Sequence, residues 1–173
     1  LDGRKTQARR VVNPQPDRFY TDGSYGALDV NGDYVWIRDA LPMVGATNRF
    51  GVPGDRLWVR ETFCKSPDGF VYRSTEQESG SNQPDDHCCW KPSIHMPRTA
   101  SRITLEIESV RVERVQEMTR GDAIAEGCPF ANVQSGLDPR AWFSELWDSI
   151  NAERGLWWES NPWVWAITFR RVK

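Results

Sequence analysis

Residues 101–116 read SRITLEIESVRVERVQ and form the longest strand-like stretch of the chain. Ile103, Leu105 and Ile107 alternate with polar residues, which is the pattern of a half-buried strand. The apolar series shifts phase near Ser109 and then continues (Val110, Val112 and Val115). A phase slip inside a strand predicts a bulge or a bend, as found where a sheet curls into a barrel.

Shorter strand-like segments flank this stretch. They lie between turn signals and span residues 5–12, 33–40, 53–64, 69–75 and 161–173. Residues 17–32 have no stable period and predict a loop with room for one short hairpin. Residues 76–89 predict a polar loop.

Two helices are predicted in the second half of the chain. Residues 119–127 begin with Thr119 as an N-cap, carry Asp122 at the capping-box position and end at Gly127. Residues 138–153 repeat apolar residues at helical spacing behind an Asp-Pro start.

About five strands with two late helices predict an α+β fold class and a single domain over residues 1–173. We expect a small, curled, mostly antiparallel sheet or β-barrel with two or three helices. The opening LDG looks like the last turn of a helix that ends at Gly3. An N-terminal strand or helix is therefore expected upstream of Leu1.

Composition and charge limit the partners and the compartment. The formal net charge is −2, so any attraction for nucleic acid has to come from a local basic patch. No apolar run approaches the roughly 20 residues of a membrane span, and we expect a cytoplasmic protein with no membrane partner. The four cysteines follow no secreted disulfide spacing and are expected to be free thiols. No cofactor is implied.

The largest local excess of positive charge lies in the opening residues, LDGRKTQARR. Four of these ten residues are basic (Arg4, Lys5, Arg9 and Arg10). One interpretation is a solvated charged edge, which is what a run of charges usually means. The other is a partly dry cleft in which the arginines bind a phosphate or carbonyl oxygen and Lys5 acts as a general base.

The segment GRKTQARR resembles the G-x-K-x-x-x-x-R signature of the ASCH domain, a small β-barrel of the PUA-like superfamily. Gly3, Lys5 and Arg10 stand at the three defining positions. Four later blocks resemble a phage and prophage branch of that family, in the same order: PGDRLWVRETF, WKPSIHMPR, ASRITLEIESVRVERVQ and WDSIN…NPWVWAITFRRV. The likeness covers most of the chain and leaves out residues 17–31 and 76–86.

The resemblance implies a cleft for RNA or for a modified nucleoside or nucleotide, in a protein of a bacterial host cytoplasm. One bacterial branch of the family is an amidohydrolase that removes the acetyl group of N4-acetylcytidine. It uses a Lys, a Thr three residues later and a Glu in the helix after the long strand. By position, the Lys is Lys5 and the Glu is Glu126, whereas Ala8 stands where the Thr is expected. Ala8 has no hydroxyl to serve as a nucleophile, and the sequence leaves open whether it is natural or engineered.

The segment HCCWKPSIHMPR holds the remaining candidates. In the context of the resemblance, four polar residues are expected to face the cleft and bind the ligand (Lys91, Ser93, His95 and Arg98). His95 stands between two apolar residues, so a hydrogen-bonded core histidine is the alternative. The segment also holds ligand types for zinc (His87, Cys88, Cys89 and His95). Adjacent cysteines rarely bind one ion, so no metal site is predicted.

Glu126 and the tryptophans have two interpretations each. Glu126 is either an ordinary surface glutamate or the acid that pairs with Lys5. Core packing is favoured by the spacing of most tryptophans over a stacking platform for bases (Trp142, Trp147, Trp157, Trp158, Trp163 and Trp165). One of the neighbours Trp157 and Trp158 is expected to be exposed.

The sequence and the resemblance together support three functions. The first is binding of RNA or a modified nucleoside or nucleotide in a basic cleft. The second is an amidohydrolase in which Lys5 activates water, or a hydroxyl at position 8, and Glu126 protonates the leaving amine. The third is a phage assembly or interaction protein in which the barrel is only a scaffold.

Overall fold

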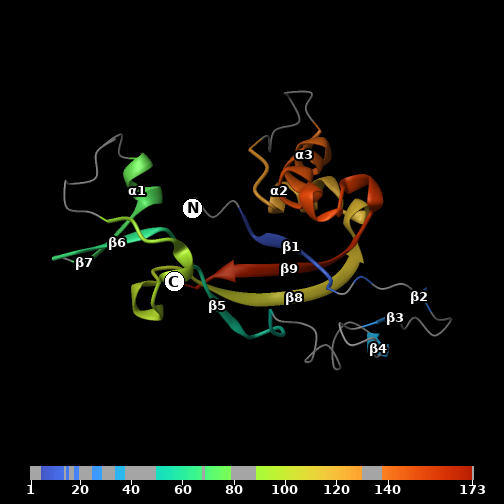
Figure 1. The fold of residues 1–173 in the computed structure, drawn as a ribbon, viewed down its shortest axis with the longest axis horizontal. Coiled ribbons are helices and arrows are strands. Elements are labelled where there is room, and N and C mark those ends of the chain that lie inside the picture. Colours follow the sequence, from blue (N-terminus) through green and yellow to red (C-terminus); the bar gives the residue numbers. More distant parts are fainter. Residues whose placement is uncertain are drawn as a thin grey trace. The chain divides into compact units, whose positions relative to one another are not determined.

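The computed structural model describes residues 5–13, 15, 18–19, 25–28, 34–37, 50–67, 69–78, 89–129 and 138–172 (Figure 1). Contacts divide the chain into two compact units. Unit 1 comprises Leu1–Asp55 and Glu106–Arg170, and unit 2 comprises Arg56–Leu105 and Arg171–Lys173. The expectation of a single domain over the whole chain stays a prediction.

The main sheet is built from strands that are far apart in the sequence. β1 (Gln7–Val11) pairs antiparallel with β9 (Trp163–Arg171), and β9 lies next to β8 (Thr104–Arg114). β8 and β9 are also antiparallel, because the start of β8 bonds to the chain after β9 and the end of β8 is followed by a bond to the chain before β9. The strand order is β1-β9-β8-β5, where β5 is Arg56–Trp58.

β8 carries the predicted phase slip. Ile107 and Val110 are both buried (1% and 4% exposed), whereas Glu108 and Ser109 between them are exposed. Residues three apart in a regular strand face opposite sides, so two buried residues at this spacing require the strand to change face. The slip near Ser109 is confirmed, in a sheet that is antiparallel and curled.

A second, smaller sheet follows β1 in the sequence. β2 (Arg18–Phe19), β3 (Tyr25–Leu28) and β4 (Tyr34–Ile37) pair antiparallel in that order. The β2–β3 pair is the short hairpin for which residues 17–32 were predicted to have room. β4 lies inside the strand predicted over residues 33–40.

The helix α2 (Arg120–Ala125) begins with the predicted capping box. The Asp122 N–H donates to the Thr119 hydroxyl at 3.1 Å, and the Thr119 N–H donates to the Asp122 carboxylate at 2.8 Å. Each end of the box satisfies a backbone donor that the first helical turn leaves unpaired. The chain leaves the helix at Gly127, whose φ of 99° favours glycine.

The helix α3 (Pro139–Asn151) also begins as predicted. The Arg140 N–H donates to the Asp138 carboxylate at 3.2 Å, and proline occupies the first helical position. A 3₁₀ turn (Ala152–Arg154) extends the helix and ends at Gly155. Two further 3₁₀ turns in unit 1 cover Val115–Glu117 and Trp158–Ser160.

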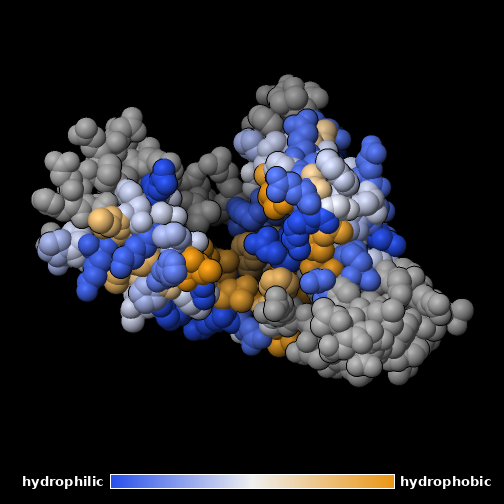
Figure 2. All heavy atoms as spheres, viewed as in Figure 1, coloured by the Kyte–Doolittle hydropathy of each residue, from blue (hydrophilic) through white to orange (hydrophobic). Residues whose placement is uncertain are grey.

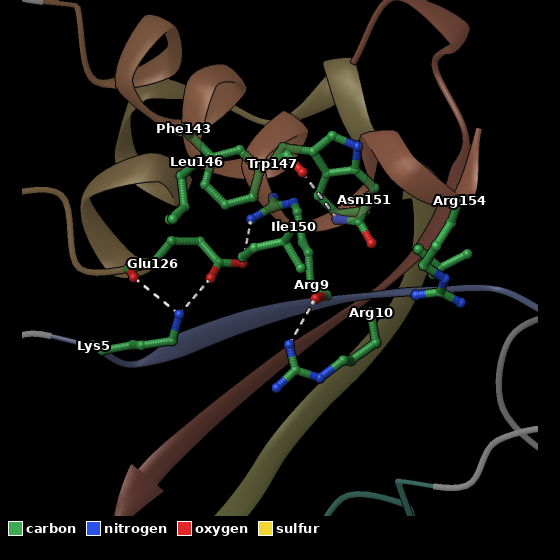
Figure 3. Close-up of a pocket in the computed structure, with 11 residues that line it drawn as sticks. Lys5, Arg9, Arg10, Glu126, Phe143, Leu146, Trp147, Ile150, Asn151 and Arg154 are labelled. Carbon is green, nitrogen blue, oxygen red and sulfur yellow. Dashed lines mark hydrogen bonds and ion pairs between the residues drawn. The ribbon is translucent and has the colours of Figure 1, made fainter. Parts of the chain in front are cut away.

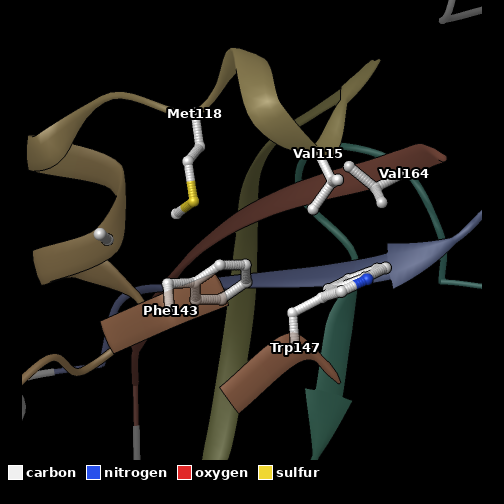
Figure 4. Packing of buried hydrophobic residues seen from close by; sticks show 6 residues of the cluster. Val115, Met118, Phe143, Trp147 and Val164 are labelled. Atoms are coloured by element: carbon white, nitrogen blue, oxygen red, sulfur yellow. The ribbon is translucent and has the colours of Figure 1, made fainter. Parts of the chain in front are cut away.

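The core of unit 1 forms where α3 packs against α2 and the sheet. Phe143 and Trp147 of α3 point toward Val115, Met118 and Val164 of the neighbouring elements (Figure 4). Ala123 of α2 belongs to the same buried cluster. The tryptophans follow the core interpretation for the most part. Trp147, Trp163 and Trp165 are buried, and Trp142 and Trp158 pack against the cluster. Trp157 is 53% exposed, as expected for one of the two neighbouring tryptophans.

Unit 2 departs from the predicted strands in two places. The strand predicted over residues 53–64 is two strands, β5 and β6 (Phe63–Ser66), because β5 lies in the main sheet while β6 pairs antiparallel with β7 (Gly69–Tyr72). The chain must change partner between them. After β7 it forms the helix α1 (Arg73–Glu78), where the end of a strand and a polar loop were predicted. The run RSTEQE contains good helix formers and no apolar residue that would hold it in a sheet.

Two proline-started turns complete unit 2. The 3₁₀ turns Ser93–His95 and Arg98–Ala100 each follow a proline, which presets the backbone for such a turn. Met96 and Ala100 from this segment pack with Phe63 in a small buried cluster.

The cysteines differ from the sequence-based expectation. Cys64 is disulfide-bonded, so the expectation of free thiols is wrong for this residue, whereas Cys89 and Cys128 are free. Spacing along the sequence was a poor guide because a disulfide depends on the separation of the two Cα atoms in the fold.

The predicted fold class is confirmed at the level of architecture. The described residues hold three α-helices and antiparallel sheets, as expected for an α+β chain with two or three helices. Within this part of the chain, none of the helices has the length and apolar character needed to cross a membrane. The closed PUA-like barrel stays a prediction.

Candidate functional site

A pocket of about 220 Å³ lies between β1 and α3 in unit 1 (Figure 3). Charged residues from both chain segments of unit 1 line it: Lys5, Arg9, Arg10, Glu126 and Arg154. Side chains of α3 supply most of the apolar wall: Phe143, Leu146, Trp147 and Ile150. A charged floor beside an apolar wall is the general make-up of a small-ligand site.

Lys5 and Glu126 meet in this pocket although 121 residues separate them. The Lys5 ammonium lies 2.9 Å from the Glu126 carboxylate and 3.1 Å from the Glu126 backbone carbonyl. The Lys5 segment is held there by the Thr6 N–H, which donates to the Ala125 carbonyl at 2.8 Å. Glu126 is 4% exposed, so the interpretation as an ordinary surface glutamate is wrong. A carboxylate buried at the end of α2 needs a cation, and Lys5 provides one.

Arg9 is the most deeply buried charge of the site, with a side chain that is 0% exposed. Its guanidinium donates to Glu113 at 2.5 and 3.0 Å, to Gln7 at 2.7 Å and to Glu126 at 3.3 Å. It also lies over the Phe143 ring, 5.9 Å from the ring centre. The solvated charged edge inferred from the run of charges is therefore wrong for Arg9, because its partners from β8 and α2 replace the water.

Two further residues extend these contacts into an ion network, which consists of Lys5, Arg9, Arg111, Glu113, Asp122 and Glu126. Arg111 contacts Glu113 at 2.6 Å and Asp122 at 2.9 Å. Burial alone would raise the pKa of Asp122. Hydrogen bonds from the Thr119 N–H and hydroxyl and the charge of Arg9 instead lower it to about 2. Three cations and three carboxylates make the network neutral.

Arg10 and Arg154 are the charges of the pocket that stand outside this network. Both are exposed, and within the described part of the chain no carboxylate lies within 4 Å of either guanidinium. Arg10 donates to the Arg9 carbonyl at 3.3 Å. The excess positive charge of the pocket is therefore on its exposed side and not on its floor.

Ala8 is half-buried in β1, opposite Ile167 of β9. Side chains alternate along a strand, so Ala8 lies on the face opposite to Gln7 and Arg9. Arg9 is the neighbour that reaches Glu126. A hydroxyl at position 8 would accordingly start from the other face of β1.

The binding candidates of the segment HCCWKPSIHMPR belong to unit 2, and none of them lines the pocket of unit 1. Lys91 and Arg98 are exposed, and Ser93 is half-buried. His95 is exposed as well, so the interpretation as a core histidine is wrong. The buried residue is Met96, which follows the turn.

Several expectations fall on residues outside the described ranges. These are the helix end at Gly3, the binding role of Arg4, and the zinc-ligand types His87 and Cys88. Among the residues that the structure does describe, no group of three or more His, Cys, Asp or Glu side chains is arranged to hold a metal ion.

Sequence reasoning missed Glu113, Asp122 as an ion-network member, Arg111 and Arg154. The sequence held a weak signal for Glu113. Arg111, Glu113 and Arg114 of β8 alternate in charge sign, and Val112 separates the first two. Nothing in the sequence marked Arg154, which lies in the turn after α3.

Comparisons with protein-family models, with curated proteins and with solved structures found no match to this chain.

Proposed function

We propose that the pocket between β1 and α3 binds a nucleotide-like anion, as part of RNA or as a modified nucleoside or nucleotide. The observation that carries the proposal is the pair Arg10 and Arg154. They line one pocket and have no carboxylate partner among the described residues. A guanidinium without a carboxylate partner favours phosphate, because its N–H groups match two phosphate oxygens.

The rest of the lining suits the other half of such a ligand. Ile150 is 63% exposed and Leu146 half-buried, so apolar surface of α3 remains open next to the arginines. A flat base or a ribose can cover that surface while the phosphate reaches the guanidinium groups. The volume of about 220 Å³ lies below the roughly 300–1,000 Å³ of clefts for drug-sized ligands, which favours a single nucleotide unit over a longer stretch.

The resemblance to the ASCH family supports the same class of ligand, since that family's motif residues Lys5 and Arg10 both line the pocket. A PUA-like fold, a phage origin and a place in the bacterial host cytoplasm belong to this proposal. The Cys64 disulfide is unusual for that compartment.

The test is a titration with N4-acetylcytidine, with its 5′-monophosphate and with a short single-stranded RNA, followed by tryptophan fluorescence. The double variant Arg10→Gln with Arg154→Gln should bind the two phosphorylated probes at least tenfold more weakly, because each substitution removes a charged hydrogen bond to phosphate. The matched control is Arg120→Gln, which removes an exposed arginine of unit 1 that does not line the pocket. Equal affinity of the double variant and the control would contradict the proposal.

A second candidate function is favoured by one specific observation, the Lys5–Glu126 pair at 2.9 Å. If the proton moves from Lys5 to Glu126, the neutral amine can take a proton from water, and the resulting hydroxide attacks the acyl carbon. Glu126 then gives its proton to the leaving amine nitrogen, so a carboxylic acid and a free amino-pyrimidine form. The step uses water and needs no hydroxyl at position 8.

Incubation with N4-acetylcytidine tests this candidate through the change in absorbance on deacetylation. Turnover by the wild type that is lost in Lys5→Ala and in Glu126→Gln supports it. The Ala8→Thr variant shows whether a hydroxyl adds a covalent route. Without turnover by either the wild type or Ala8→Thr, the amidohydrolase is excluded for this substrate while the binding proposal stands on its own titration.

A further inference from the structure

Two arginines of unit 2 stack on one tryptophan. The guanidinium carbon of Arg60 lies 4.6 Å from the Trp58 ring centre, and that of Arg98 lies 5.8 Å from it. We call Trp58, Arg60 and Arg98 the arginine-tryptophan cluster. The ring attracts both cations. The two like charges repel each other, and the attraction of both to a nearby anion would offset that repulsion.

No carboxylate of the described residues lies within 4 Å of Arg60 or Arg98. Arg102 in the same unit shows the contrast. It stacks on Tyr72 at 4.1 Å and is neutralised by Glu61 at 2.7 Å. The side-chain hydrogen bond of Arg102 holds the pKa of Glu61 below its ordinary value. Arg102 is thus paired with a carboxylate of the described residues, whereas Arg60 and Arg98 are not.

Most guanidinium N–H donors of the cluster have no acceptor among the described residues. Arg60 donates to the Ile94 carbonyl at 3.3 Å, and Arg98 donates to the Thr104 hydroxyl at 3.5 Å. A guanidinium has five N–H donors, so each keeps several that no described residue uses. Both arginines are exposed.

The whole of unit 2 has the opposite charge from the chain. Its sequence holds nine Lys and Arg residues against six Asp and Glu, although the chain as a whole has a net charge of −2. Hydrophilic residues cover much of the visible face around β6, β7 and α1 (Figure 2). A local excess of positive charge on a protein of negative net charge favours anions near that region.

We propose that the arginine-tryptophan cluster is a binding site for the phosphate backbone of single-stranded nucleic acid. The guanidinium groups supply phosphate donors in a fixed orientation, and the half-buried Trp58 offers the remainder of its ring to a base. A polymer with both a phosphate and a flat base in each unit fits this combination. None of its three residues lines the pocket of unit 1, and the proposal does not depend on the function proposed for that pocket.

Fluorescence anisotropy with a labelled single-stranded RNA oligonucleotide at several salt concentrations tests the proposal. In the double variant Arg60→Gln with Arg98→Gln, the affinity for RNA should fall about tenfold for each arginine removed. The slope of log affinity against log salt concentration should fall by about 1.4 in magnitude, because each of the two lost phosphate contacts contributes about 0.7. The matched control is Arg73→Gln, an exposed arginine of the same unit that is not part of the cluster. It should keep nearly the full slope. Thermal unfolding checks that each variant is folded.

The proposal would be overturned by no RNA binding by the wild type, by an unchanged slope in the double variant, by an equal loss in Arg73→Gln, or by equal affinity for inorganic polyphosphate of the same charge. Trp58→Leu keeps the charge and removes the ring. It should weaken RNA binding with little change in the salt slope. RNA binding that is lost in Arg10→Gln with Arg154→Gln and kept in the cluster variant would support the pocket and overturn the cluster.

Discussion

Replacement of Arg9 by methionine tests whether the ion network stabilises unit 1. Methionine keeps most of the length and the apolar stem of arginine, so no large cavity forms beside Phe143. The charge is lost, and Glu113, Asp122 and Glu126 lose the group that contacts all three. Breaking a buried ion pair costs about 3–5 kcal/mol, because the remaining charge is left without compensation.

The lower end of that range is expected here. Lys5 still contacts Glu126, and Arg111 still contacts Glu113 and Asp122, so each carboxylate keeps one cation. We therefore expect Arg9→Met to lower the free energy of unfolding by about 3 kcal/mol at neutral pH. The loss should shrink in acid, because protonated carboxyl groups no longer need the guanidinium.

Urea unfolding followed by tryptophan fluorescence measures this difference. The matched control is Arg10→Met, the exposed neighbour on the same strand, which should change stability by about 0.5 kcal/mol or less. A loss in Arg9→Met no larger than in the control would refute the reasoning. If Arg9→Met does not fold, Arg9→Lys keeps the charge without the forked geometry, and it should lie between the wild type and the full loss.

Three other predictions concern single groups. The pKa of Asp122 is lowered from 3.8 to about 2 in the folded protein, so its carboxylate adds about 2 kcal/mol to the free energy of unfolding above pH 4. This contribution is lost as the pH falls to 2. In Asp122→Asn, the free energy of unfolding measured by chemical unfolding should therefore depend less on pH between 4 and 2. Gly127→Ala should cost roughly 1–2 kcal/mol in thermal unfolding, because alanine is strained at φ 99°. Phe143→Ala should cost about 3–5 kcal/mol through the cavity it leaves, whereas Ile150→Ala, at a side chain that is 63% exposed, should cost about 0.5 kcal/mol or less in the same assay.

The fold was predictable where the signal is local. Both helix starts depend on one capping residue and its neighbours, and the change of face near Ser109 is visible in the spacing of apolar residues. The split between β5 and β6 was not, because alternation within residues 53–64 is the same whether a strand keeps or changes its partner. Partner choice is decided by residues far away in the chain.

The candidate site was predictable only in part, and for a different reason. The pairing of Lys5 with Glu126 came from a resemblance and not from spacing. Hydropathy would place Gln7 and Arg9 on the outer face of β1, yet both are buried. The sequence cannot show this reversal, because the carboxylate that neutralises Arg9 is 104 residues away.

The pairing of β1 with β9 also has a consequence for the nascent chain. Gln7 contacts Thr168, 161 residues later, and at 5–20 residues per second this partner emerges roughly 8–32 s after β1. During that interval β1 is an unpaired strand that other chains can join. Its sequence QARRV carries two adjacent arginines, and charges of this kind act as gatekeepers against intermolecular strand pairing. The arginines that later hold the ion network and line the pocket thus protect the chain before either exists.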